Sequence, residues 1–231
     1  MKKIINRLAL TPWQSILISA FYLLVICLFA FADSGAAFRG VEPAIIFDEV
    51  DYLTFSRWLL LMSAPILIDG YLLLRVGKAR LYMSLRMKNH AEWYSYTLTL
   101  CLLNTLYWSV LLLPAILFAL PAEEAVSVWL LLLFNNFVWL MLTLLLSIMM
   151  KGSPTFGVFA ILILGVSFLL GEFVPRLRPW TPGTWSMMCR TDEYWSGGGS
   201  VRHYLGASGM LALVLLGAFR VLARSNPYKE F

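Results

Sequence analysis

The residues that could carry catalysis or bind a metal are few in this chain and lie far apart. They are two histidines, His90 and His203, and three cysteines, Cys27, Cys101 and Cys189, with no CxxC or Cys/His spacing. A protein metal site draws several such ligands from short, regular spacings, so we expect neither a metal site nor a disulfide framework. A Gly-rich phosphate loop is also missing, so the sequence predicts no ATP binding by a Walker motif and no catalytic site.

Acidic residues near apolar runs are the next candidates. Asp69 lies inside such a run, where an ionisable side chain marks either a transport pathway or a structural hydrogen bond, for example to Asn104. Glu123-Glu124 resembles the paired acids of intramembrane CAAX-type proteases. The arginine that should follow, and histidines in later apolar runs, are missing. We therefore expect no protease site, and both interpretations of Asp69 stay open.

The composition predicts a membrane protein. Hydrophobic residues make up 60% of 231 residues, charged residues 13%, and the mean hydropathy is +0.77. A helix needs about 20 apolar residues to cross the hydrocarbon core. Runs of that kind predict one all-α polytopic domain with six transmembrane helices, at about 13–32, 57–74, 94–120, 126–149, 156–174 and 205–222.

The distribution of positive charge predicts the orientation. With both termini in the cytoplasm, twelve of the eighteen Lys and Arg residues fall on cytoplasmic segments, as the positive-inside rule requires. The net charge of +5 is therefore a topology signal, and we expect lipid contact and no nucleic-acid binding. Met1–Leu10 has one apolar side and three cations, which predicts a short interfacial helix. It lacks the small-residue cleavage site of a signal peptide.

The most basic segment is Arg75–Trp93, between the second and third predicted spans, with five Lys or Arg and one acid. Helical spacing gives it two apolar faces, formed by Leu81, Tyr82, Leu85 and Trp93 and by Met83 and Met87. A helix that only lies on lipid needs one such face. A second face containing methionine favours a protein partner, because methionine fits irregular grooves. The alternative is a simple cytoplasmic anchor.

The segment Pro175–Tyr204, between the fifth and sixth predicted spans, is unusually aromatic. It contains Trp180, Trp185 and Trp195 and ends in a glycine triplet. Two arrangements fit it: short helices that re-enter the outer leaflet against protein, or a folded external cap anchored by interfacial tryptophans. Either arrangement would close the outer end of a pathway.

This layout resembles the membrane subunits of ABC-2 type exporters. They too have an interfacial N-terminal helix, six spans, a cytoplasmic coupling helix between spans two and three, and a re-entrant segment between spans five and six. The patterns Arg75-Val-Gly-Lys-Ala…Trp93-Tyr94 and Pro182-Gly-Thr-Trp185…Arg190 are similar to small permeases of bacterial peptide-antibiotic export and self-protection systems.

The resemblance implies a permease in the bacterial plasma membrane that exports a hydrophobic or peptide substrate, with a role in antibiotic-peptide resistance. It implies two ABC ATPase subunits that hold ATP and Mg, a second permease copy or homologous subunit, and no cofactor on this chain. Trp180, Trp185 and Arg190 would form an outer gate or cap. The ATPase-coupling residues would lie on Lys78–Trp93, and are Arg80, Tyr82, Met83, Leu85, Arg86 and Met87.

Two other functions remain open from the residues. A substrate-binding subunit of an energy-coupling-factor type vitamin importer is equally compact, and would bind its ligand without an ATPase present. A stand-alone secondary carrier needs ionisable residues near the midplane, and Asp69 is the candidate for that role. A plain interaction scaffold has no distinguishing signal.

Overall fold

The computed structural model describes residues 17, 20–28, 35–44, 50–84, 90–150 and 155–224, with backbone only at 69–84, 90, 91, 93, 223 and 224. This part of the chain is helical, and its one β-type pairing is an isolated bridge between Thr191 and Gly199. Residues 20–28 are helical. The further elements are α3 (Ala36–Arg39), α4 (Tyr52–Ser84), α5 (His90–Ala119), α6 (Ala122–Met149), α7 (Phe156–Phe173), the 3₁₀ turns η2 (Pro175–Trp180), η3 (Pro182–Thr184) and η4 (Met188–Arg190), and α8 (Val201–Arg224).

Four of these helices are long and apolar enough to cross a membrane. Their apolar stretches are Tyr94–Ala119, Ala122–Met149, Phe156–Phe173 and Val201–Leu222, and Tyr52–Ile68 is a shorter apolar stretch in α4. The chain is thus an all-helical, multi-pass membrane protein over its described residues. These helices agree with the third to sixth predicted spans within a few residues. Of the first predicted span only residues 17 and 20–28 are described, and Met1–Leu10 lies outside the description.

The basic stretch differs from its prediction. We expected a separate helix over Lys78–Trp93, but α4 continues unbroken to Ser84 as a helix of 33 residues, and α5 begins at His90. Residues 70–84 contain no proline, and single glycines such as Gly77 cost a helix only about 1 kcal/mol each, which is too little to end it. Residues 85–89 lie outside the description.

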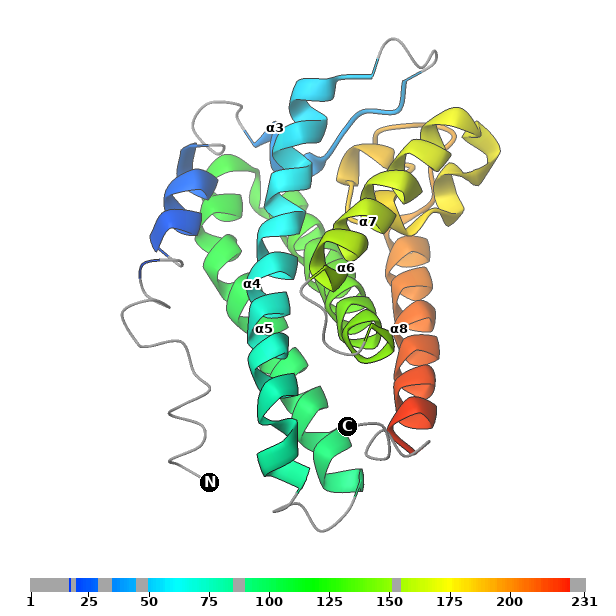
Figure 1. The fold of residues 1–231 in the computed structure, drawn as a ribbon. Coiled ribbons are helices and arrows are strands. Elements are labelled where there is room, and N and C mark those ends of the chain that lie inside the picture. Colours follow the sequence, from blue (N-terminus) through cyan, green and yellow to red (C-terminus); the bar gives the residue numbers. More distant parts are fainter. Residues whose placement is uncertain are drawn as a thin grey trace.

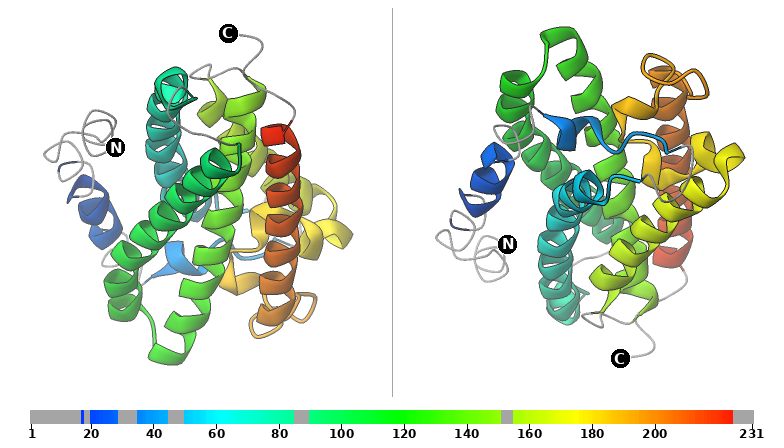
Figure 2. Two further views of the ribbon diagram at one scale, coloured as in Figure 1. Left: turned by 90° about the horizontal axis from the view of Figure 1, so that it is seen from below. Right: turned by 90° about the horizontal axis from the view of Figure 1, so that it is seen from above.

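Helix α6 forms the centre of the bundle. It contacts α4, α5, α7 and α8, and 61% of its apolar stretch is buried, against 39% or less for the other three spanning helices (Figure 2). Aromatic side chains join the outer helices: Phe55 of α4 stacks on Phe168 of α7 with ring centroids 4.3 Å apart. Leucine, valine and phenylalanine side chains on the outside of the bundle are exposed, as lipid contact requires.

An aspartate caps the first turn of α4. One Asp51 carboxylate oxygen accepts hydrogen bonds from the backbone N–H groups of Leu53 and Thr54, at 3.0 and 3.1 Å, and the other accepts from the Thr54 hydroxyl at 2.6 Å. These bonds, led by the one from the Thr54 side chain, lower the pKa of Asp51.

Replacing Asp51 with alanine should therefore lower the free energy of unfolding by about 1 kcal/mol at neutral pH. Because the folded pKa is lowered, the stabilisation is present above the unfolded pKa of about 3.9 and is lost as the pH falls through the folded pKa. Thermal unfolding in detergent at several pH values measures it. Asp51→Asn keeps an oxygen acceptor but should lose the pH dependence, and an equal loss in Asp51→Ala at low and neutral pH would contradict the assignment.

Candidate functional site: a buried arginine–glutamate cluster beneath a cap

A compact cap follows α7. Pro175 ends that helix, because a proline lacks the N–H that the next helical bond needs and restricts the residue before it. Three short 3₁₀ turns follow, and η2 and η3 each begin with proline, whose fixed φ suits a first helical position. Residues 175–200, which we call the cap, fold back over one end of the bundle. The C-terminal ends of α4 and α8 lie at the opposite end (Figure 1).

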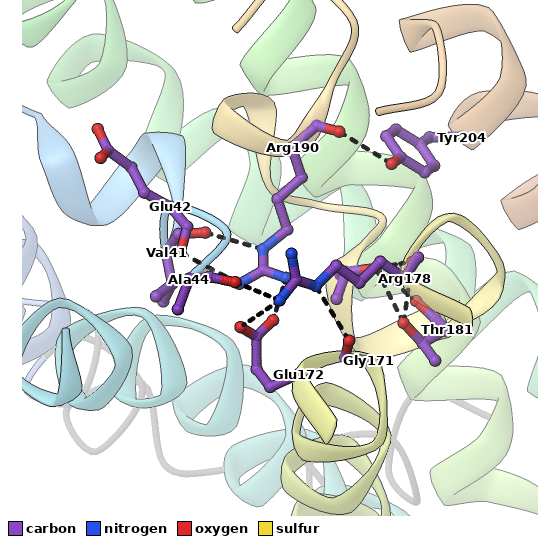
Figure 3. Close-up of polar contacts among 10 residues, drawn as sticks. Val41, Glu42, Ala44, Gly171, Glu172, Arg178, Thr181, Arg190 and Tyr204 are labelled. Carbon is purple, nitrogen blue, oxygen red and sulfur yellow. Dashed lines mark hydrogen bonds and ion pairs between the residues drawn. The ribbon is translucent and has the colours of Figure 1, made fainter. Parts of the chain in front are cut away.

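Three charged side chains meet beneath the cap (Figure 3). Glu172 comes from the last turn of α7, Arg178 from η2 and Arg190 from η4. Their side chains are 0%, 6% and 1% exposed. Arg190 Nη1 donates to Glu172 Oε1, and Arg178 Nη2 lies 3.6 Å from Glu172 Oε2. We call these three residues the ion cluster.

Backbone carbonyls complete the cluster. Arg190 Nε donates to the Val41 carbonyl at 2.8 Å, Arg178 Nε donates to the Gly171 carbonyl at 3.1 Å, and Arg178 Nη2 donates to the Ala44 carbonyl. Two cations thus share one carboxylate, and partial negative charges on carbonyl oxygens offset the excess. This arrangement fixes the positions of η2, η4 and the end of α7 relative to one another.

Aromatic faces cover both guanidinium groups. The Arg190 guanidinium lies 5.0 Å from the ring centre of Phe168, and that of Arg178 lies 5.4 Å from Trp195. Cation–π attraction of this kind strengthens when water is excluded. Burial lowers the pKa of Arg178 from its usual value, but an arginine starts so high that the group stays charged.

The segment 35–44, which we call the strap, is held at two places. Its C-terminal half supplies the carbonyls for the ion cluster. Its N-terminal half is held by a two-bond ion pair between Arg39 and Glu124 of α6, with Nε–Oε1 at 2.6 Å and Nη2–Oε2 at 2.9 Å. The hydrogen bond to Glu124 raises the pKa of Arg39. Between them Gly40 has φ +91°, and a Cβ there would lie 2.4 Å from Met187 Cγ, so the strap needs glycine at this position.

Helices α4 and α8 also bond to the cap. The Trp58 indole of α4 donates to the Ser186 hydroxyl at 3.3 Å. The Tyr204 hydroxyl of α8 donates to the Arg190 carbonyl at 3.0 Å and accepts from the Gly199 N–H at 3.2 Å. The cap is therefore joined to α4, α7, α8 and the strap, so a displacement of any of these elements acts on it.

The structure brings together only part of the predicted site. Arg190 is at the centre of the ion cluster. Trp185 is buried and donates to the Pro179 carbonyl at 3.0 Å, whereas Trp180 is 60% exposed, with its ring edge-on to His203. These three residues do belong to one cap.

The other predicted residues lie elsewhere. Asn104 is half-buried on α5, away from the cap in sequence and in element. The side chain of Asp69 is outside the description, as are those of Arg80, Tyr82 and Met83, whose backbone belongs to α4. Leu85, Arg86 and Met87 lie wholly outside the described residues.

Sequence reasoning missed Glu172 and Arg178. The acids considered were Asp69, Glu123 and Glu124, and Glu172 was overlooked although it lies in the apolar stretch Phe156–Phe173. Its signal was available: a glutamate at the end of an apolar run, followed within the next segment by several arginines. Of the two acids Glu123 and Glu124, Glu124 is engaged in the ion pair with Arg39.

The described residues offer no group of three His, Cys, Asp or Glu that could hold a metal. Cys189 is buried in the cap, and burial raises the pKa of its thiol to about 12, so it is unreactive. Comparisons with protein-family models, with curated proteins and with solved structures found no match. Fold and site together define a multi-pass helical membrane protein with one end of its bundle capped.

Proposed function

We propose that this chain is the membrane-spanning permease subunit of an ATP-binding-cassette exporter of a hydrophobic or peptide substrate. The observation that supports this most is the difference between the two ends of the bundle. One end is closed by a cap anchored on a buried ion cluster. The other carries the basic C-terminal end of α4, where a separate ATPase would dock.

Helix α4 supports this proposal by its length. At 1.5 Å per residue its 33 residues extend about 50 Å, whereas the hydrocarbon core is about 30 Å thick. Its last turns, with Arg75, Lys78 and Arg80, extend well past the apolar stretch Tyr52–Ile68. The positive-inside rule places such an end in the cytoplasm.

The same helix connects the two ends. Near its start Trp58 bonds to Ser186 of the cap, and Phe55 stacks on Phe168, which in turn lies under Arg190. A displacement of the basic end of α4 by a docked partner would therefore move the residues near the start of the same helix, which contact the cap. ATP binding to a partner would drive opening only if the partner binds the open and closed states with different affinity.

Co-purification from native membranes tests the proposal. An ATPase subunit should be recovered with the tagged chain, and its activity should be measured in the eluate. Arg80→Glu should reduce this recovery at least tenfold by reversing the charge at the basic end of α4. Arg202→Glu, an exposed arginine at the capped end, is the matched control and should not change it. An active chain that carries no ATPase would refute the proposal and favour a carrier or a ligand-binding subunit.

A further inference from the structure

Two polar side chains without partners lie at the centre of the bundle. Asn135 is 0% exposed and Trp139 is 2% exposed, both on α6. Neither Asn135 Nδ2, Asn135 Oδ1 nor Trp139 Nε1 has a hydrogen-bond partner. Leaving one buried donor or acceptor unsatisfied costs about 1–3 kcal/mol, so three such atoms need an explanation.

The two residues belong to one face of α6. They are four positions apart, which places them one turn from each other on the same side of the helix. A long side chain in a helix points back toward the N-terminus, so the Trp139 ring extends toward the turn that holds Asn135. One turn further, the Thr143 hydroxyl is satisfied by donating to the Trp139 carbonyl at 2.7 Å. Among the described residues of α6, the unpaired atoms therefore belong to Asn135 and Trp139.

Both residues lie near the middle of α6, the most buried of the four spanning helices. Residue 135 lies about 20 Å along a helix that is about 42 Å long, at 1.5 Å per residue. Bulk water does not reach this depth in a closed bundle, although a single water molecule can be held inside it, and lipid tails offer no hydrogen bonds. A partner for these atoms must therefore come from a molecule held within the bundle.

The chemistry of the orphaned atoms defines that molecule. Asn135 offers two N–H donors and one carbonyl acceptor, and Trp139 offers one more donor. Donors exceed acceptors, so the best guest presents an oxygen acceptor. The guest should be uncharged, because Asp, Glu, Lys and Arg are missing from 93–122, 125–150, 152–171 and 203–219 on the four helices of the bundle.

We propose that Asn135 and Trp139 form an internal binding site for an uncharged group with an oxygen acceptor, either water or the carbonyl of an amide or ester. This site is separate from the ion cluster, which lies beneath the cap and is charged. It does not depend on the export function, because its test measures binding and not transport.

The test is an NMR spectrum of the full chain in micelles, with ¹⁵N-labelled tryptophan. The chain has nine tryptophans, and the indole signal lost in Trp139→Phe, or in Trp139→Tyr if that variant folds better, identifies Trp139. We expect its indole proton to show a cross-peak to water, or a saturable shift on titration with N-methylacetamide, a neutral carbonyl probe. Acetate and methylammonium, of similar size but charged, should cause no shift.

The source of the oxygen follows from which response is seen. A water cross-peak without a probe shift assigns the site to ordered water, and a saturable probe shift assigns it to organic carbonyls. Asn135→Leu should weaken the response about tenfold, the equivalent of one lost hydrogen bond. Asn136→Leu is the matched control, since Asn136 is the neighbouring buried amide and lies on a different side of α6 from Asn135.

Three outcomes would overturn the inference. The first is an indole signal that shows neither water contact nor a response to the neutral probe. The second is an equal response to acetate or methylammonium. The third is an Asn135→Leu response that matches that of the wild-type protein.

Discussion

Replacing Arg190 with methionine should lower the free energy of unfolding by about 3–5 kcal/mol, the largest effect that we expect from a single substitution. Removing one partner of a buried ion group leaves the other charge uncompensated in a medium that solvates it poorly. Here Glu172 would keep only Arg178 at 3.6 Å, and the Val41 carbonyl would lose its donor. The strap and the cap would lose their main connection. Unfolding in mixed micelles with increasing denaturing detergent measures the loss.

Two further variants serve as comparisons for this measurement. Arg176→Met changes an exposed arginine of the same cap and should stay within about 0.5 kcal/mol of the wild-type protein. Arg190→Lys keeps the charge but loses the planar guanidinium that bonds the carboxylate and the carbonyl together. Its free energy of unfolding should therefore lie between those of Arg190→Met and Arg176→Met. If Arg190→Met is no less stable than Arg176→Met, the ion cluster does not hold the cap.

The second large effect is expected from Gly183→Ala, at the closest approach of the cap to α7. A Cβ at this position would lie 2.6 Å from the Phe168 backbone nitrogen and 2.9 Å from the Leu164 carbonyl oxygen. Both atoms belong to a helix backbone that has no rotamer to change, so the cap itself must shift. The shift would strain the hydrogen bond from the Gly183 N–H to the Ser167 hydroxyl, now 2.9 Å. Overpacking of this kind costs about 1–3 kcal/mol.

A glycine of α7, the helix on which Gly183 rests, provides the control. Around Gly165 of α7 a new Cβ would meet nothing within 4 Å. Alanine there should be neutral or should stabilise the helix by up to about 1 kcal/mol, because glycine is the poorer helix former. The same detergent titration compares the two variants. Equal stability of Gly183→Ala and Gly165→Ala would mean that the cap does not rest on α7 as closely as the distances imply.

The spanning helices could be predicted from the sequence because the bilayer imposes their length. An apolar run long enough to cross it satisfies its own backbone hydrogen bonds only as a helix, whatever it packs against. The ends of helices are harder to predict. We expected a separate helix over Lys78–Trp93 because apolar content falls after residue 74, but helix formation depends on propensity, which residues 75–84 keep, and α4 continues to Ser84.

The cap shows where prediction from sequence stops. Its position between two spans and its aromatic character could be predicted from composition and local pattern, whereas the membership of Arg190 was implied by the resemblance to ABC-2 permeases. The partners of Arg190 could not be predicted, because it bonds to the carbonyl of Val41, and every residue carries a carbonyl. The residue type does not indicate which backbone carbonyl will accept the bond, so the contribution of the strap cannot be predicted before the tertiary structure is known.

Residue types and spacing by themselves determined that this chain is a helical membrane protein, where its apolar helices lie, and which loop is folded. Those properties depend on the solvent and on neighbours along the chain. Only the tertiary structure decided that Glu172, Arg178 and Arg190 share one buried site, that the strap is held by Arg39 and Glu124, and that Asn135 and Trp139 lack partners. Each of these depends on which distant segments exclude water from one another, and burial of that kind is set by packing.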